Sequence, residues 1–531
     1  MGQKLPILLS SLLLAGTAAT AQNQNSGVFS GDLMTNVNFF NRDTAINASG
    51  NPLYDNLLSG GESWLSLRYS NYGFTGYLRM DAFHNSNLRF PTQPTTGFGI
   101  GAWSISKEFQ KLSITGGYIY DQIGSGIIFR AYEDRGLLID NALVGLRLKY
   151  DLTDNISVKA FTGQQKNLFD RYAPIIKGIN FEGSFSIKDK VFFNPGIGAV
   201  NRTMDKSSMD AVITRINALP LEERKEPKYN MYALTAYNML SAGNFSWYVE
   251  GAYKSQEAFN DYNGGIQVND GSLFYTNMSY AVKGLAANVT AKRTQNFVMR
   301  TSPSESANFG MVNWQPIVAQ IRPQRLIARY TPQSLDWSEL ALGGNILYSP
   351  NDEYDFNVSY THINTIEKLK LYREAYFETN IRSIKNVRLQ LGLHYMNYNQ
   401  EYYQFKPGHP MVKALTPFAE FAYKLSPKRS ITVQAQYMDT KQDFGSWAFL
   451  QVEYALAPKW SFALSDMYNI KPSTATAKKE HYYNAFVAYT KGAHRFSAAW
   501  VKQVEGINCT GGVCRYEPAF NGFKLMITSS F

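Results

Sequence analysis

The stretch VRLQLGLHY at residues 387–395 alternates an apolar side chain with a polar or small one. Its apolar members share one side of an extended chain, because successive side chains of a β-strand point to opposite faces. The same period of two recurs in VGLRLKY at 144–150, LAANVTAK at 285–292 and YDFNVSYT at 354–361. The chain is therefore predicted to contain many strands, each with one apolar and one polar face.

The connections between these segments are alternately short and long. Short ones such as 70–73 and 241–244 carry the Gly, Asn and Ser that tight turns require. Long polar ones include 203–227 and 296–335. Short turns at one end and long loops at the other are typical of bacterial outer-membrane β-barrels. We count about twenty-four strands between 28 and 531, within a range of about 22–26.

The composition excludes other classes of large protein. The chain has 531 residues, of which 44% are hydrophobic and 14% aromatic, and its mean hydropathy is −0.28. These values do not fit a disordered chain or a bundle of membrane helices, and no apolar run of about 18 residues follows residue 21. The choice lies between a soluble β-protein and strands that cross a membrane.

Three features favour strands that cross a membrane. The chain ends in FKLMITSSF at 523–531, which resembles the C-terminal strand that outer-membrane assembly machinery reads. No motif repeats at the long period of a propeller or solenoid. Aromatic residues gather near strand ends, as in an interfacial girdle: Trp64, Tyr69, Tyr150, Trp247, Tyr280, Tyr398, Tyr423, Tyr454, Trp460 and Tyr489. We therefore predict an all-β fold, a single large closed antiparallel transmembrane β-barrel.

Residues 1–21 have the pattern of a cleaved signal peptide. Lys4 precedes an apolar stretch at 5–14, and Ala-Thr-Ala at 19–21 forms a cleavage signal of small residues. Residues 22–531 would then form the barrel, exported to the bacterial outer membrane.

Charged residues within the strands predict which face encloses the lumen. A Lys or Arg that faces lipid at mid-membrane costs roughly 2–4 kcal/mol. We therefore expect the charged side chains to face inward and their apolar neighbours to face lipid. The residues concerned include Arg147, Lys149, Lys292, Arg388 and Glu453.

The segment 121–141 interrupts the alternation and concentrates charge. Glycines at 124, 126 and 136 allow sharp backbone turns. One interpretation is a loop folded into the lumen that narrows the pore; the other is an ordered extracellular loop held by its own salt bridges. The candidate lumen or constriction residues are Asp121, Arg130, Glu133, Asp134 and Arg135.

The segment 296–336 is the longest one without alternation, and it is rich in arginine. Its candidate lumen residues are Arg322, Arg325 and Arg329. Guanidinium groups suit the carboxylates or phosphates of a solute or of lipopolysaccharide. The alternative is a solvated loop whose arginines meet carboxylates of the lumen wall. A further connection, 207–219, has apolar residues at spacings of three and four, which predicts a short helix.

Cys509 and Cys514 are the only cysteines and enclose four residues of the last long loop. In an oxidising compartment we expect a disulfide between them, on the extracellular side. The alternatives are a redox pair or a soft-metal site, but no His or third Cys is near in sequence.

No motif for catalysis, metal binding or nucleic-acid binding is present. The six histidines form no H-x-x-x-H or H-x-H pair, and there is no P-loop or G-x-S-x-G. The net charge of +10 is spread along the chain rather than gathered in a basic run. We therefore expect no enzyme, no metal, no cofactor and no nucleic-acid partner.

Four stretches resemble an uncharacterised outer-membrane barrel family of Bacteroidota-type bacteria, known only as a domain of unknown function. They are GVFSGD at 27–32, GSGIIFRAYEDR at 124–135, NFSWY at 244–248 and AYKS at 252–255. The resemblance covers nearly the whole of the chain after residue 21. It implies an outer-membrane location and a barrel fold, and it supplies no activity or catalytic residues.

Two functions fit these observations. The first is a porin-like or gated channel for polar solutes, with a wide polar lumen partly filled by 121–141 and 296–336. The second is a non-conducting accessory barrel of a larger complex for outer-membrane protein assembly, secretion or surface anchoring. Its long loops would bind other envelope proteins. In both cases the barrel contacts outer-membrane lipid and lipopolysaccharide.

Overall fold

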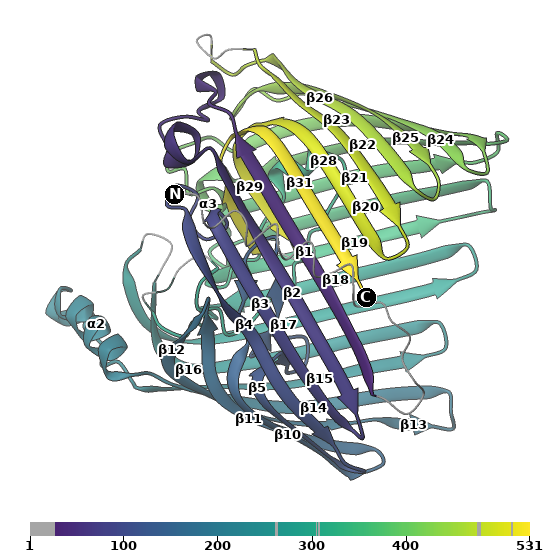
Figure 1. Ribbon diagram of the computed structural model, residues 1–531. Coiled ribbons are helices and arrows are strands. Elements are labelled where there is room, and N and C mark those ends of the chain that lie inside the picture. Colours follow the sequence, from purple (N-terminus) through teal and green to yellow (C-terminus); the bar gives the residue numbers. More distant parts are fainter. Residues whose placement is uncertain (1–26, 261–263, 304, 306–307, 475–478, 511–512) are drawn as a thin grey trace.

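A ring of antiparallel strands makes up the protein. The computed structural model describes residues 27–260, 264–303, 305, 308–474, 479–510 and 513–531. Within these residues, twenty-four strands pair in cyclic order (Figure 1). They are β1 (Val28–Phe40), β2 (Ser59–Asn71), β3 (Phe74–Ser86), β4 (Thr95–Glu108), β5 (Leu112–Ile119), β10 (Leu143–Thr153), β11 (Ile156–Asn167), β12 (Asp170–Gly183), β14 (Val191–Thr203), β15 (Asn230–Ala242), β16 (Phe245–Asn260), β17 (Ile266–Val282), β18 (Leu285–Gln295), β19 (Ser338–Tyr348), β20 (Tyr354–Asn364), β21 (Lys370–Ile381), β22 (Val387–Tyr398), β23 (Val412–Ser426), β24 (Arg429–Met438), β25 (Ser446–Leu456), β26 (Trp460–Lys471), β27 (His481–Lys491), β28 (His494–Gln503) and β31 (Phe520–Ser530). A short strand, β13 (Phe185–Ile187), continues β12 against β14.

The ring closes where the first strand pairs with the last. β1 and β31 run antiparallel, from Asp32 opposite Ser530 to Phe40 opposite Gly522. β31 also pairs with β28, so the described strands of the ring leave no open edge between them. The prediction of an all-β, closed antiparallel barrel with about twenty-four strands is confirmed.

The two faces of the barrel wall differ in polarity, because side chains alternate between them along each strand. Along β19, Leu340 and Leu342 are 49% and 52% exposed, whereas Glu339 is 1% exposed. Along β22, Leu393 is 44% exposed and its neighbour His394 is 1% exposed. The outer face is therefore apolar and the polar side chains point inward, as lipid around the barrel and loops within it require.

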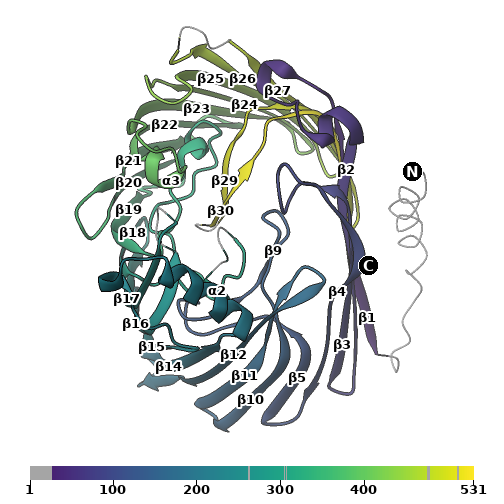
Figure 2. The same cartoon turned by 90° about the vertical axis from the view of Figure 1, so that its left-hand side faces the viewer.

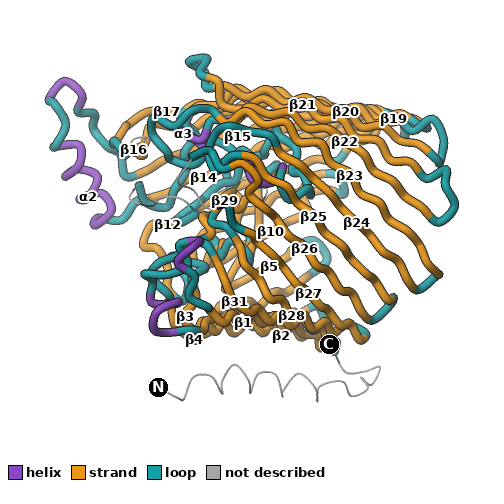
Figure 3. The backbone as a smooth tube through the Cα atoms, turned by 90° about the horizontal axis from the view of Figure 1, so that it is seen from above, coloured by secondary structure: helices purple, strands orange, loops and turns teal. Residues whose placement is uncertain are grey.

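The two ends of the barrel differ. At one end the strands are joined by turns of two to five residues, and at the other by connections as long as 296–337 (Figures 1 and 3). Both Val28 and Ser530 lie at the end with the short turns, as an even number of strands requires. None of the helices in the described residues is long and apolar enough to span a membrane.

Short elements occupy the long connections. They are η1 (Thr44–Ile46), η2 (Leu53–Leu57), β6 (Asp121–Gln122), β7 (Arg130–Ala131), β8 (Glu133–Asp134), β9 (Ile139–Asp140), α2 (Lys206–Asn217), η3 (Leu221–Glu223), η4 (Ile327–Tyr330), α3 (Gln400–Tyr403), β29 (Gly506–Thr510) and β30 (Val513–Glu517). The helix predicted at 207–219 is present as α2, capped by the carboxylate of Asp205, which accepts from the N–H of Ser208. Its apolar side packs against Val268 and Ala258 of neighbouring strands. The apolar residues spaced three and four apart in the sequence therefore do form one face of a helix.

Two of the aromatic residues assigned to the girdle face inward instead. Trp64 is 2% and Tyr398 is 1% exposed. Each lies on the same face of its strand as buried residues two positions away. The face of the strand therefore predicts whether such a side chain points inward better than its position near a strand end does. Others, such as Tyr69, Tyr280 and Trp460, are 40–47% exposed on the outer face. The predicted signal peptide, 1–21, lies outside the described residues.

Candidate functional site

Two long connections, 120–142 and 296–337, lie inside the ring of strands and contact one another (Figure 2). We call them together the plug. The backbone N–H of Arg130 donates to the carbonyl of Val312 at 3.0 Å. The backbone N–H of Trp314 likewise donates to the carbonyl of Gly126, and the side-chain amides of Asn141 and Asn313 donate to the carbonyls of Met311 and Ile127. The plug is therefore a single hydrogen-bonded body rather than two separate loops.

Apolar packing joins the plug to the wall. Ile127, Ile128 and Phe129 are 0–1% exposed and belong to a cluster with inward side chains of β11, β12 and β14–β17. On the opposite side, Leu326, Tyr330 and other plug residues pack on β19–β26 through a second cluster. Buried contact of this extent makes the plug part of the folded barrel.

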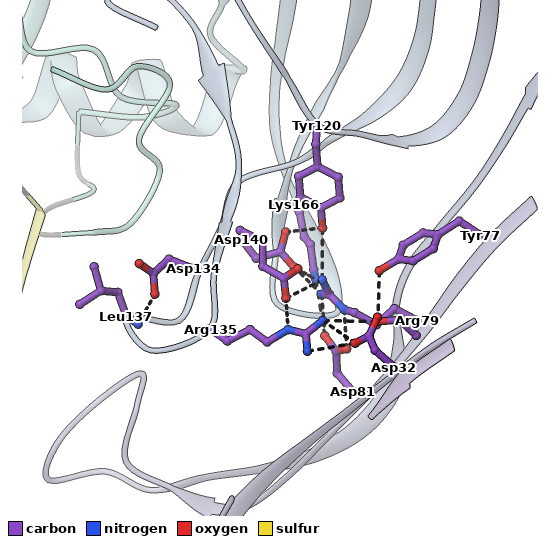
Figure 4. Close-up of polar contacts among 12 residues, drawn as sticks. Asp32, Tyr77, Arg79, Asp81, Tyr120, Asp134, Arg135, Leu137, Asp140 and Lys166 are labelled. Carbon is purple, nitrogen blue, oxygen red and sulfur yellow. Dashed lines mark hydrogen bonds and ion pairs between the residues drawn. The ribbon is translucent and has the colours of Figure 1, made fainter. Parts of the chain in front are cut away.

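A network of charges fastens 120–142 to the wall (Figure 4). Arg79 of β3 is 1% exposed and lies 2.7 Å from Asp81, 3.0 Å from Glu133 and 2.5 Å from Asp140. Lys166 of β11 also pairs with Asp140, and it lies 3.7 Å from Asp81. Two carboxylates of the plug, Glu133 and Asp140, thus pair with wall cations. The carboxylate of Asp81, also on the wall, lies close to both of these cations.

The protonation state of Asp140 follows from this network. Burial alone would raise the pKa of its carboxyl group, but the charges of Lys166 and Arg79 outweigh burial, and the pKa is lowered. The hydroxyl of Tyr120 donates to the same carboxylate at 2.9 Å. Asp140 is therefore an anion that holds the plug in place at neutral pH.

The sequence-predicted residues of 121–141 take different positions. Glu133 and Arg135 pair at 2.7 Å, and Arg135 lies 3.4 Å from Asp32 of β1. Asp121 accepts from Lys159 of β11 at 2.7 Å. Among the described residues, the side chain of Asp134 accepts a hydrogen bond from the N–H of Leu137 in its own turn and from no other group. Arg130 stacks on Tyr132 and Trp314, at 4.7 and 4.5 Å from the ring centroids. The structure thus brings Glu133 and Arg135 together and leaves Asp121 and Asp134 apart from them.

Arg322 anchors the second connection. Its guanidinium lies 2.7 Å from the carboxylate of Glu374 on β21, donates to Ser359 on β20, and sits 3.6 Å from the ring centroid of Tyr376. Further along the wall, Lys292 of β18 pairs with Glu339 at 2.8 Å and donates to Pro316 of the plug at 3.0 Å. Both sites are buried, since these side chains are 8% exposed or less.

Arg325 and Arg329 face a cavity of about 640 Å³. One side of it is the plug segment 321–331, and the other is formed by strands β24–β28. Polar wall residues on it are Gln434, Gln451, Ser465, Tyr483 and Asn484. A second cavity, of about 560 Å³, shares Tyr516 and Ile507 with the first. Space therefore remains inside the ring beside the plug.

The predicted cysteine pair lies on a hairpin at the edge of these cavities. Strands β29 and β30 pair so that Cys509 is opposite Cys514. Figure 2 shows this hairpin within the ring, and its residues line both cavities. The last long connection thus turns inward rather than projecting away from the barrel. The side chain of Cys509 lies outside the described part, so the disulfide stays a prediction.

The sequence reasoning missed the wall partners of the plug. The wall residues that contact the plug are Arg79, Lys166, Arg202, Lys254, Glu339 and Glu374; Asp81 and Glu257 balance the cations among them, and all eight are buried. Arg202 and Lys254 share Glu257, at 2.5 and 2.9 Å. The sequence does contain a signal for these residues. Each is a charged residue at an inward position of an alternating strand, and a charge buried there requires a partner of opposite charge.

A closed ring with an apolar outer face, short turns at one end and loops folded within it defines the class: a transmembrane β-barrel of the outer-membrane type with an internal plug. Residues 3–531 match the model of the "Family of unknown function (DUF6029)". The chain belongs to this family, so the predicted membership in a barrel family of unknown function is confirmed, while the predicted bacterial group stays a prediction. No curated protein matches the chain.

Several solved structures show a general likeness at low identity. The P pilus usher (PapC) translocation pore has 10% identity and a TM-score of 0.45, with 95% of this chain and 99% of that chain covered. The ferric-catecholate import receptor Fiu from E. coli K12 has 10% identity and a TM-score of 0.36, with 96% and 82% covered. OccK1 (OpdK) from Pseudomonas aeruginosa has 10% identity and a TM-score of 0.35, with 82% and 98% covered. The fold assignment rests on the closure of this barrel itself.

Proposed function

We propose that the protein is a narrow, porin-like or gated channel of the bacterial outer membrane that admits polar solutes beside its plug. One observation carries the proposal: a cavity of about 640 Å³ lies between part of the plug and the wall strands β24–β28, and polar side chains make up much of its lining. A wide barrel filled this far offers only a restricted route, and such a route selects by width and charge. No catalytic role is part of the proposal.

Conductance of the pure protein in planar bilayers tests this function. The wild-type protein should give small open-pore steps, and a variant lacking 296–336 should give larger ones, because the plug then no longer fills the lumen. A variant lacking α2 (Lys206–Asn217) is the control, since this helix projects from the rim (Figure 1) and its loss should leave the steps unchanged. Silence of both the wild type and the 296–336 deletion would exclude a channel.

A second candidate is a non-conducting accessory barrel within a larger envelope complex. The observation that favours it is the fastening of the plug: buried pairs such as Arg79–Asp140 and Arg322–Glu374 hold both connections to the wall. A plug of this kind suits a barrel whose rim binds other envelope proteins. A silent barrel that co-purifies with defined envelope partners would support this candidate over the channel.

A further inference from the structure

Within the described part of the chain, two arginines of the plug segment 321–331 lack the carboxylate partner that Arg322 has. Among the described residues, neither Arg325 nor Arg329 forms an ion pair, whereas Arg322 in the same segment is neutralised by Glu374 at 2.7 Å. Both side chains line the cavity of about 640 Å³. Inside a barrel, where water is restricted, unneutralised guanidinium groups attract anions more strongly than they would at a solvated surface.

The carboxylates that border this cavity already have partners. Asp443 lies 2.8 Å from Lys406 and accepts from Tyr330 at 2.9 Å. Glu517 lies 2.9 Å from Arg515 and accepts from Gln503 at 2.9 Å, and Glu505 accepts from Tyr516 at 2.7 Å. Lys502 is likewise balanced by Asp43 and Glu480. Asp443 and Glu517 are therefore neutralised by cations, whereas Glu505 meets a neutral hydroxyl. Among the described residues, Arg325 and Arg329 are the lining cations without a carboxylate partner.

Aromatic rings hold Arg329 in position. Its guanidinium lies 4.8 Å from the ring centroid of Trp447 and 5.3 Å from that of Phe444. Stacking on aromatic faces fixes the plane of the group without neutralising its charge. A ligand carboxylate or phosphate is the usual partner for a guanidinium arranged in this way.

Arg325 experiences the same unbalanced charge. Arg325 is exposed to the cavity, yet desolvation by the surrounding protein and the neighbouring charge of Arg329 lower the pKa of its guanidinium, although Glu517 acts in the opposite direction. An ordinary arginine pKa is so high that the group stays charged throughout the physiological range. Two like charges held near each other in this cavity would be stabilised by an anion bound between them.

We infer that the Arg325–Arg329 face of the cavity is a binding site for small organic anions, whose carboxylate or phosphate group meets the two guanidiniums. Apolar side chains on the remaining cavity surface, including Phe449, Met467 and Val501, suit the body of such a solute. The volume lies in the range of small-molecule sites. The inference deepens the proposed channel, because an anion site beside the plug would set which solutes pass.

Binding to the purified, detergent-solubilised protein tests the inference without requiring conduction. Isothermal titration calorimetry would compare benzoate and phenyl phosphate with benzamide, a neutral analogue of benzoate. Both anions, or the preferred one of the two, should bind the wild type, and benzamide should not. The variants Arg325→Gln and Arg329→Gln should each weaken anion binding by about tenfold or more, as loss of a charge-assisted bond predicts.

Two further variants separate the site from general effects. Arg293→Gln makes the same change of charge on β18, where Arg293 bonds to Ser272 and Gln295 outside this cavity, and it should bind like the wild type. Arg325→Lys keeps the charge and should retain most of the affinity. Heat-modifiable migration in gels confirms that each variant is folded.

The outcomes distinguish the site from the channel. Equal binding of benzamide, or unchanged affinity in both glutamine variants, overturns the anion site. Absence of binding by a protein that conducts overturns the site and leaves the proposed channel intact. Anion binding that depends on the arginines, in a protein that never conducts, supports the site and overturns the channel.

Discussion

Arg322 in the plug and Glu374 on β21 form a buried ion pair, with Nη2 and Oε1 2.7 Å apart. Their side chains are 8% and 1% exposed, and the pair lies where the 296–337 connection meets the wall. A buried ion pair of this kind contributes little to stability by comparison with apolar packing. Removal of one partner is costly, however, because it leaves the other charge buried without a counter-charge. The pair therefore fixes where the plug sits more than how stable the barrel is.

The first prediction concerns this pair. Glu374→Gln should destabilise the seated plug by about 3–5 kcal/mol, because Arg322 is left buried without its counter-charge. In bilayers the variant should show larger or noisier current steps than the wild type. The double variant Arg322→Met/Glu374→Leu should restore much of the wild-type behaviour, since no charge is then stranded; steps as noisy as those of Glu374→Gln would contradict this account.

The second prediction concerns closure of the ring. Gly31 and Phe531 exchange both backbone hydrogen bonds, at 2.8 and 3.0 Å. A Cβ at position 31 would lie 2.5 Å from the Phe531 ring and 2.9 Å from the backbone oxygen of Ser66 on β2. Gly31→Val should therefore lower the folded fraction in detergent, measured by heat-modifiable migration. Gly251→Val is the matched control, because a Cβ there meets nothing within 4 Å. Equal folding of the two variants would argue against this close packing of β1 between β2 and β31.

The third prediction concerns Asp140. Its pKa is lowered from 3.8 in the folded protein, so its contribution is present at pH values above 3.8 and is lost as pH falls through the lowered pKa. At pH 7, Asp140→Asn should speed amide exchange in 131–140, measured by mass spectrometry. The difference from the wild type should vanish at strongly acidic pH, where the native carboxyl is protonated.

Asp134→Asn is the control for this measurement, because Asp134 accepts only from Leu137 in its own turn and takes no part in the network around Arg79. It should leave exchange elsewhere in the segment unchanged. An Asp140→Asn variant that exchanges like the wild type at pH 7 would show that the ion pairs do not hold the plug.

The fourth prediction concerns the cysteine pair. Cys509 and Cys514 are register partners in the β29–β30 hairpin, and an oxidising compartment favours their disulfide. Protein purified from the envelope without reductant should be two mass units lighter than the reduced form. Full alkylation of both thiols without reduction would contradict the prediction.

Much of the fold could be predicted from the sequence, because lipid imposes a strict rule on strand faces. The alternation at 387–395 is confirmed, with Leu393 exposed and His394 buried. The plug could not be predicted to the same depth. Its contacts, such as Arg130 to Val312, join residues far apart in the chain, and no local pattern reports such pairing. Nor could sequence separate Arg322, which finds Glu374, from Arg325 and Arg329, which do not.

The most direct test of the central claim is chemical modification of one wall residue during current recording. Ser465 of β26 lines the cavity, whereas its neighbour Leu464 is 62% exposed on the outer face. With both native cysteines replaced by Ser, a Ser465→Cys channel should lose current when a charged thiol reagent is added, and a Leu464→Cys channel should not. Full modification of Cys at 465, verified by mass, with undiminished current would contradict a solute route beside the plug.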